Sequence, residues 1–130
     1  MGLHEYRLET GREGFYAITG KISEAIAESG VLEGLCVIFS PHTTAGIAIN
    51  ENADPDVRYD LLLGLRNAFP EQPGFRHGEG NSTAHLRAGA VGGSQTVIVR
   101  DGKPLLGVWQ DIYFCEFDGP RQRRFFVKVM

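Results

Sequence analysis

Three short segments of the chain gather polar side chains of the kinds that bind metal ions and phosphate groups. They are His42-Thr43-Thr44, the segment from Asn50 to Asp54, and the segment from His77 to His85. Imidazole nitrogens suit zinc and other transition metals, carboxylates suit magnesium, and backbone N–H groups at a helix start suit anions. Together these residue types indicate a polar site for a small charged metabolite.

The third segment carries the strongest signal. Asn81 or Ser82 can cap a short helix, which places His85 in its first turn, where the helix dipole favours a neutral ring that can bind a metal ion. The glycines of this segment bring backbone N–H groups to the same helix end. We therefore predict His77 and His85 as metal ligands, and Asn81 and Ser82 as substrate-binding residues. A purely structural role of the histidines is the alternative.

The first two segments add candidates for the same site. Asp54 is explained as a helix cap, but Asn50 and Glu51 precede the cap and are not. We predict Glu51 as a catalytic group that orients or handles a proton, and Asn50 as a substrate contact. His42 is a third candidate metal ligand and a second candidate catalytic residue, although polar residues after a proline often only satisfy backbone groups.

Two further candidates lie near the C-terminus. Gln110 shares a strand face with Glu116, and a buried amide there needs a partner. Arg121 follows the Asp118-Gly119 turn, where a guanidinium at the end of a sheet can bind phosphate through two hydrogen bonds. We predict both as substrate-binding residues, against the simpler alternative of a hairpin with a solvated basic strand.

The bulk composition limits the class of protein. A chain of 130 residues, 42% hydrophobic and 22% charged, is expected to form one domain over residues 1–130. It has no long apolar run and no secretory signal, so we expect a cytoplasmic protein without membrane contact. A net charge of -3 speaks against nucleic-acid binding. Cys36 and Cys115 lie in apolar, strand-like segments and are expected to be reduced core residues.

Hydrophobic patterning predicts an α+β fold, mainly an antiparallel two-sheet β-sandwich with about three short helices. The first two strands are expected to form a hairpin, and the last two an antiparallel pair. Strands are expected at residues 3–9, 15–18, 35–40, 45–49, 96–99, 108–117 and 125–129, and helices at about residues 19–30, 54–69 and 82–88.

The motifs that hold these candidates occur in order over almost the whole chain. They are His42-Thr43-Thr44-Ala45-Gly46, residues 49–57, residues 77–85, Leu106-Gly107-Val108-Trp109-Gln110, and Glu116-Phe117-Asp118-Gly119-Pro120-Arg121. With these motifs in this order, the chain resembles the YjbQ (UPF0047) family. Two positions depart from the family pattern: Val108 stands where a threonine is expected, and Thr83 where an acidic residue is frequent, which puts a carboxylate ligand in doubt.

The resemblance implies a β-sandwich with helices, assembled as a homotrimer, and a secondary thiamine-phosphate synthase activity. Such an enzyme joins a pyrimidine pyrophosphate to a thiazole phosphate and releases pyrophosphate. The residue types of the candidate site, rather than the resemblance, make zinc or magnesium the expected metal. Two alternatives stay open: a metal-dependent hydrolase of a small phosphorylated or other polar metabolite, with zinc-bound hydroxide, and a non-catalytic metabolite-binding trimer.

Overall fold

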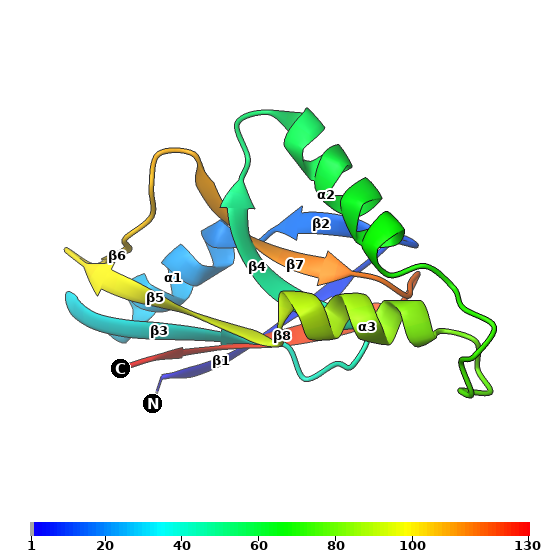
Figure 1. Cartoon of the computed structure of the whole chain (residues 1–130). Coiled ribbons are helices and arrows are strands. Elements are labelled where there is room, and N and C mark those ends of the chain that lie inside the picture. The colour runs from blue at the N-terminus through cyan, green and yellow to red at the C-terminus, as the bar shows by residue number, and fades with distance from the viewer. Residues whose placement is uncertain (1) are drawn as a thin grey trace.

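The computed structural model describes residues 2–130 as two antiparallel sheets and three helices, which confirms the predicted α+β sandwich (Figure 1). The five-stranded sheet, in the order β1-β8-β3-β5-β6, consists of β1 (Leu3–Glu9), β3 (Glu33–Phe39), β5 (Ser94–Arg100), β6 (Lys103–Pro104) and β8 (Gln122–Val129). The three-stranded sheet, in the order β2-β7-β4, consists of β2 (Gly14–Ala17), β4 (Ala45–Glu51) and β7 (Gln110–Glu116). The helices are α1 (Thr19–Ser29), α2 (Pro55–Ala68) and α3 (Ser82–Val91).

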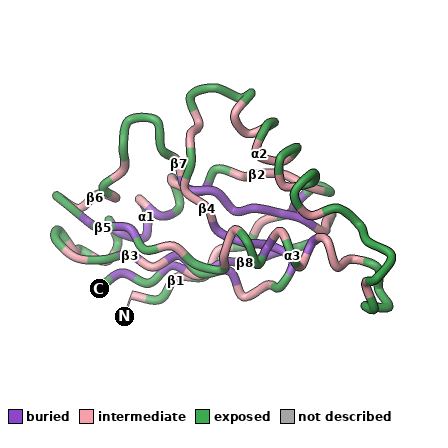
Figure 2. Tube along the Cα trace, viewed as in Figure 1, coloured by how far each residue is buried: buried purple, intermediate pink, exposed green. Residues whose placement is uncertain are grey.

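The hydrophobic core lies in two parts, on either side of the three-stranded sheet. The larger part fills the space between the two sheets and α1, and includes Ile22, Ile47, Phe114 and Val127. The smaller part lies between the other face of the three-stranded sheet and helices α2 and α3. Strand β7 is therefore buried on both faces, as its apolar residues on both parities predict, and Figure 2 shows it as a buried strand through the centre.

Both predicted strand pairs are wrong. Strand β1 pairs with β8 and β2 with β7, so the first two strands lie in different sheets. The last two strands are separated in the same way, because β7 is central between β2 and β4, and β8 is central between β1 and β3. The turn around Asp118 and Gly119 carries the chain from one sheet to the other. It is a corner of the sandwich where a hairpin was expected.

The predicted N-terminal cap forms in α2, but the predicted caps of α1 and α3 do not form. Asp54 caps α2 by accepting a hydrogen bond from Asp56 N at 2.9 Å, with Pro55 at the first helical position. Thr19 begins α1, but its hydroxyl bonds to Asp111 and accepts from Ile112 N. Asn81 is the N-cap residue of α3, yet its side chain makes no capping bond. The amide of Asn81 is committed elsewhere, which links this helix to the site described below.

The corner at Gly119 has no room for a side chain. A Cβ on this residue would collide with the backbone oxygen of Gly11, and Gly119 N already donates to Arg12 O at 2.9 Å. We expect Gly119→Ala to lower the free energy of unfolding by about 1–3 kcal/mol in urea denaturation. Gly74→Ala is the control, because nothing lies within 4 Å of its Cβ position. Equal midpoints for both variants would contradict this packing.

Both cysteines are core residues, as expected. Cys36 and Cys115 are free and buried. Burial raises the pKa of the Cys36 thiol to about 11 and that of Cys115 to about 12, so both stay protonated and unreactive. Within residues 2–130, no helix combines the length and the apolar character needed to cross a membrane.

Candidate functional site

A buried ion pair between β7 and β8 anchors the candidate site. The Arg123 guanidinium donates to Glu116 through Nε at 2.7 Å and through Nη2 at 2.5 Å, and the two side chains are 5% and 0% exposed. Thr10 Oγ1 donates to the same carboxylate at 2.5 Å, and Thr44 Oγ1 accepts from Arg123 Nη2 at 2.8 Å. The pair therefore ties both sheets to the loop after β1 and the loop before β4.

The Glu116 carboxylate is held in its charged form. Burial by itself raises a carboxyl pKa, but the hydrogen bonds from Arg123, Thr10 and the backbone of Asp118 outweigh it. The pKa of Glu116 therefore lies below its ordinary value. Because the folded state binds this proton less readily than the unfolded chain, the contribution to stability is lost as the pH falls through this lowered pKa.

The network continues from Glu116 to the first turn of α3. Asp118 N donates to Glu116 at 2.9 Å, and the Asp118 carboxylate accepts from Asn81 Nδ2 at 2.8 Å and from Arg121 Nη2 at 2.9 Å. Arg121 Nε also donates to the backbone oxygen of Asp118, at 2.8 Å. Burial raises the Asp118 pKa, but these side-chain bonds outweigh it and hold the pKa below its ordinary value. Asn81 and Arg121 are therefore fixed beside each other by a charged carboxylate.

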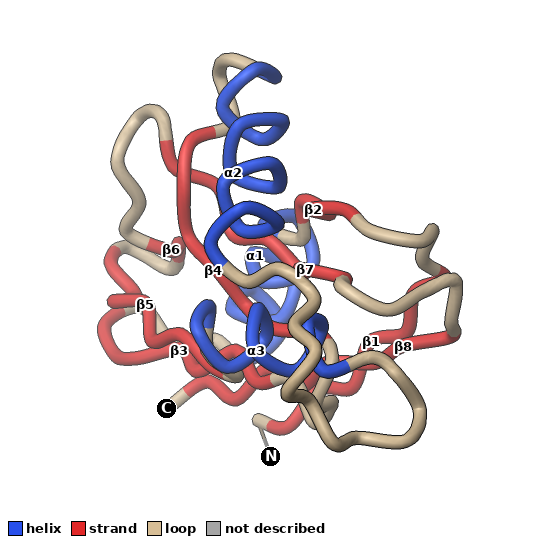
Figure 3. The backbone as a smooth tube through the Cα atoms, turned by 45° about the vertical axis from the view of Figure 1, so that its right-hand side comes forward, coloured by secondary structure: helices blue, strands red, loops and turns tan. Residues whose placement is uncertain are grey.

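The first turn of α3 separates two pockets. A polar pocket of about 260 Å³ lies on one side and is lined by Arg12, Glu13, Asn81, Arg87 and Asp118, among others. The second, of about 410 Å³, lies on the other side and is lined by Phe75, His77, Ser82, His85 and Leu86. The long loop between α2 and α3, drawn in tan in Figure 3, contributes Phe75 and His77 to the second pocket.

The structure brings five of the predicted residues to this turn. The rings of His77 and His85 lie 5.3 Å apart between centroids and nearly perpendicular, at 86°. Ser82 lines the same pocket, and Asn81 and Arg121 meet through Asp118. This cluster offers two imidazoles, a hydroxyl, an amide and a guanidinium at a helix N-terminus, which are groups that bind a phosphorylated molecule.

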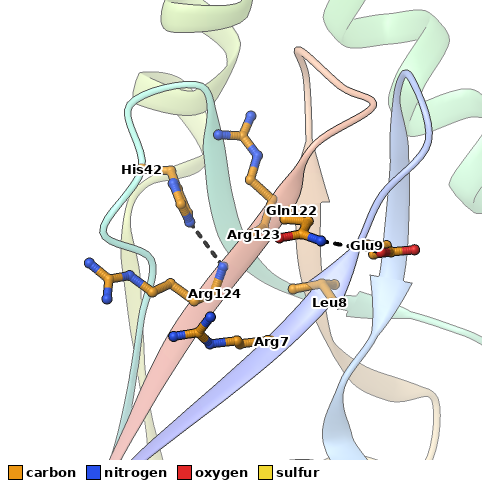
Figure 4. A pocket seen from close by; sticks show the side chains of 7 residues that line it. All are labelled: Arg7, Leu8, Glu9, His42, Gln122, Arg123 and Arg124. Carbon is orange, nitrogen blue, oxygen red and sulfur yellow. Dashed lines mark hydrogen bonds between the residues drawn. The ribbon is translucent and has the colours of Figure 1, made fainter.

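His42 does not join the other two histidines. It lines a separate pocket of about 540 Å³ above β1 and β8, with Arg7, Gln122 and Arg124 (Figure 4). Its Nε2 accepts a hydrogen bond from Arg124 N at 3.0 Å, so this nitrogen carries no proton and has no free lone pair for a metal. The loop from Ser40 to Thr44 ends over β8 rather than at α3, which is why the predicted three-histidine group does not form in one chain.

The partly buried position of His42 gives a testable pH dependence. Burial, followed by the nearby Arg123 guanidinium, lowers the pKa of His42. The unfolded chain therefore takes up this proton at a higher pH than the folded state, so stability is lost as the pH falls below about 6.5, the ordinary histidine value. We expect the free energy of unfolding to fall less between pH 7 and pH 5.5 in His42→Gln than in wild type. Parallel pH profiles would contradict this.

Asn50, Glu51 and Gln110 lie at the opposite end of the three-stranded sheet. Glu51 pairs with Gln110, whereas Ala45, six residues earlier, pairs with Glu116. At about 3.3 Å per residue the two ends are about 20 Å apart. Asn50 Oδ1 accepts from Glu51 N at 2.7 Å, and the Gln110 amide, exposed where we expected it buried, accepts from Gly107 N at 2.8 Å. These three residues do not reach the α3 turn within one chain.

Several charged residues of the site were not among the predicted binding residues, including Arg123, Arg12, Glu13 and Arg87. Arg123 was detectable, because it shares the inward parity of Phe125 and Val127 in β8, and a charge at such a position needs a buried partner. The sequence has no comparable signal for Arg12, Glu13 or Arg87, which reach the polar pocket only through the tertiary fold.

Similarity to known proteins assigns the family. The family model described as "UPF0047 protein YjbQ-like" matches residues 4–130. The chain belongs to the YjbQ/UPF0047 family. UPF0047 protein MJ1081 of Methanocaldococcus jannaschii is 54% identical over 98% of this chain and 94% of its own length. UPF0047 protein YugU of Bacillus subtilis is 49% identical over 93% of this chain and 92% of its own.

Solved structures of YjbQ/UPF0047 relatives have the same fold. An uncharacterized conserved protein of the family from Clostridium acetobutylicum aligns with a TM-score of 0.95 and 52% identity, over 98% of this chain and 99% of that one. A protein of unknown function from Sulfolobus solfataricus aligns with a TM-score of 0.92 and 30% identity, over 98% and 94% of the two chains. The resemblance seen in the motifs is thus confirmed for family and fold.

A metal centre is not complete in the single YjbQ-like chain. Among residues 2–130, no three His, Cys, Asp or Glu side chains come together as a metal-binding group. The paired rings of His77 and His85 amount to two imidazoles, whereas a catalytic zinc takes three ligands from the protein. The residues of one chain therefore do not fit a catalytic zinc site, and the predicted zinc or magnesium stays a prediction.

Proposed function

We propose that this YjbQ-family chain is a transferase of the secondary thiamine-phosphate synthase type. The thiazole nitrogen of one substrate forms a bond to the methylene carbon of the pyrimidine pyrophosphate, the bond from that carbon to oxygen breaks, and pyrophosphate leaves with the electron pair. Little proton transfer is required, so the protein's task is to bind both substrates and to stabilise charge on the leaving group.

The observation that carries the proposal is the position of Arg121. Its guanidinium is bound through Nε and Nη2 to Asp118, which also holds Asn81 at the start of α3. A cation fixed in advance beside a helix N-terminus stabilises developing negative charge without reorganising. In this proposal Arg121 contacts the leaving pyrophosphate, Asn81 and Ser82 bind substrate, and the rings of His77 and His85 donate hydrogen bonds beside them.

The direct test supplies purified enzyme with both substrates. We expect thiamine phosphate, detected by mass spectrometry, and an equal amount of released pyrophosphate, with both products reduced in His85→Ala. The matched control is His4→Ala, because His4 lies on β1, where it pairs with the half-exposed Glu28. No product above the enzyme-free reaction would contradict the proposal.

The histidine pair also supports a second candidate, a metal-dependent hydrolase. Two imidazoles whose centroids are 5.3 Å apart could share an ion if a further ligand completed the site. For this candidate we expect about one transition metal per chain in tag-free protein, lost in both His77→Ala and His85→Ala. Metal-free wild type after supplementation would eliminate it.

The proposal also includes a homotrimeric assembly, a small phosphorylated metabolite as the ligand, and a cytoplasmic location. A non-catalytic metabolite-binding role is the alternative. Tight binding of both substrates without turnover would favour that last alternative.

A further inference from the structure

Two of the residues that line the polar pocket beside α3 each have a buried polar atom without a hydrogen-bond partner. Within residues 2–130, the only buried side-chain atoms that lack a hydrogen bond are Asn81 Oδ1 and Arg87 Nε. Both residues line this same pocket of about 260 Å³. Buried polar groups are almost always satisfied, so an acceptor and a donor left without partners on two residues of one pocket point to a ligand that satisfies them after a small side-chain adjustment.

The orientation of Asn81 is fixed by its neighbour. Its Nδ2 donates to the Asp118 carboxylate at 2.8 Å, and a flipped amide would put two acceptor oxygens against each other. Oδ1 is therefore the atom left without a partner, and only a hydrogen-bond donor can satisfy it. A fully ionised anion such as sulfate has no such donor, whereas a phosphate group with one P–OH has one.

Two of the three nitrogens of the Arg87 guanidinium have partners, and Nε has none. Its side chain is only 11% exposed, Nη1 lies 3.5 Å from Glu13 Oε1, and Nη2 donates to the backbone oxygen of Phe69 at 3.2 Å. These contacts fix the plane of the guanidinium and leave the Nε–H group. Because this group is a charged donor in a desolvated position, an anionic oxygen is its best acceptor.

The charges around the pocket favour an anion. Arg12, Arg87 and Arg121 are opposed by two carboxylates, Glu13 and Asp118. Glu13 also forms an ion pair with Arg66, at 3.0 Å, so positive charge exceeds negative charge around the pocket. The side chain of Arg12 is exposed and, among the contacts of residues 2–130, has no ion pair of its own. Water molecules would fit at about 30 Å³ each, but they would leave this excess charge uncompensated.

We propose that this pocket binds the phosphate group of a phosphorylated metabolite, in a form that keeps one P–OH group or offers a neighbouring hydroxyl. A phosphate oxygen accepts from Arg87 Nε–H, Arg12 closes over the anion from the rim, and the hydroxyl donates to Asn81 Oδ1. This inference depends on the proposed function only because both sites lie at the first turn of α3. The pocket is a second phosphate position beside the one assigned to Arg121.

The test is binding of inorganic phosphate by titration calorimetry at neutral pH, with sulfate at the same ionic strength as the comparison. Turnover is not measured, so the result is independent of the proposed reaction. We expect saturable phosphate binding that is about tenfold or more tighter than sulfate binding, since one hydrogen bond is gained. Equal affinities, or no saturable phosphate binding, would overturn the proposal.

Variants locate the binding site. Arg12→Ala removes an exposed side chain that has no ion pair within residues 2–130, so it should fold normally, and we expect it to weaken phosphate binding about tenfold or more. Asn81→Ala should abolish the preference for phosphate over sulfate while anion binding persists. Arg7→Ala, on β1, is the control and should bind as wild type does. Wild-type affinity and selectivity in both Arg12→Ala and Asn81→Ala would place the phosphate elsewhere and refute the assignment.

Discussion

Replacing Glu116 by alanine is expected to lower the free energy of unfolding by about 3–5 kcal/mol, the largest effect on stability that we predict for a single residue. The substitution leaves the Arg123 guanidinium, 5% exposed, without its carboxylate, and it removes the acceptor used by Thr10. It also frees Asp118 N, so the corner that positions Arg121 loosens. Urea denaturation followed by circular dichroism measures the change.

Two variants separate the buried charge from simple loss of packing. Glu116→Gln with Arg123→Met removes both charges, and we expect it to recover much of the loss, because a buried pair replaced by neutral groups costs little. Glu5→Ala breaks the exposed ion pairs with Arg7 and Arg124 and should change stability by less than about 1 kcal/mol. A loss in Glu116→Ala no greater than that in Glu5→Ala would show that the pair is not buried as described.

Replacing Arg121 by alanine is expected to lower kcat of the proposed reaction by about 10²–10³-fold. The guanidinium is fixed before substrate binds and meets charge that develops only as pyrophosphate leaves, so KM should change much less than kcat. Stability should be almost unaffected, since the side chain is 49% exposed and its ion pair with Asp118 lies at the surface. Steady-state kinetics of pyrophosphate release gives both constants.

Arg124→Ala is the matched control for Arg121→Ala. Arg124 is a half-exposed arginine on the same strand and pairs only loosely with Glu5, at 3.8 Å. We expect its kinetics to match wild type. Equal kcat in the two variants would remove Arg121 from the reaction, and a change confined to KM would assign it to ground-state binding.

The fold was predictable where the information is local. The capping residue and proline of α2, the αL glycine that ends α1, and the two apolar faces of β7 could all be read from neighbouring residues. Strand pairing could not, because Asp118-Gly119 has the same local chemistry in a hairpin and in a corner between sheets. Long-range packing of both faces of β7 decides between them.

The candidate site was likewise predictable only where its residues are close in sequence. His77, His85, Asn81 and Ser82 are close in sequence, and a helix start was enough to predict that they meet. Glu51 and His42 were grouped with them because polar residues at strand ends often converge. Which end of a strand reaches which helix depends on strand direction and pairing, and in this fold Glu51 lies at the far end of β4.

The most direct test of a pyrophosphate site at α3 is an NMR titration of the side-chain amides with inorganic pyrophosphate. We expect saturable shifts of the Asn81 amide and the Arg121 guanidinium, with the Asn50 and Gln110 amides, about 20 Å away along the sheet, unchanged. Saturable shifts at Asn50 and Gln110 with none at Asn81 would contradict this expectation and move the site to the other end of the three-stranded sheet.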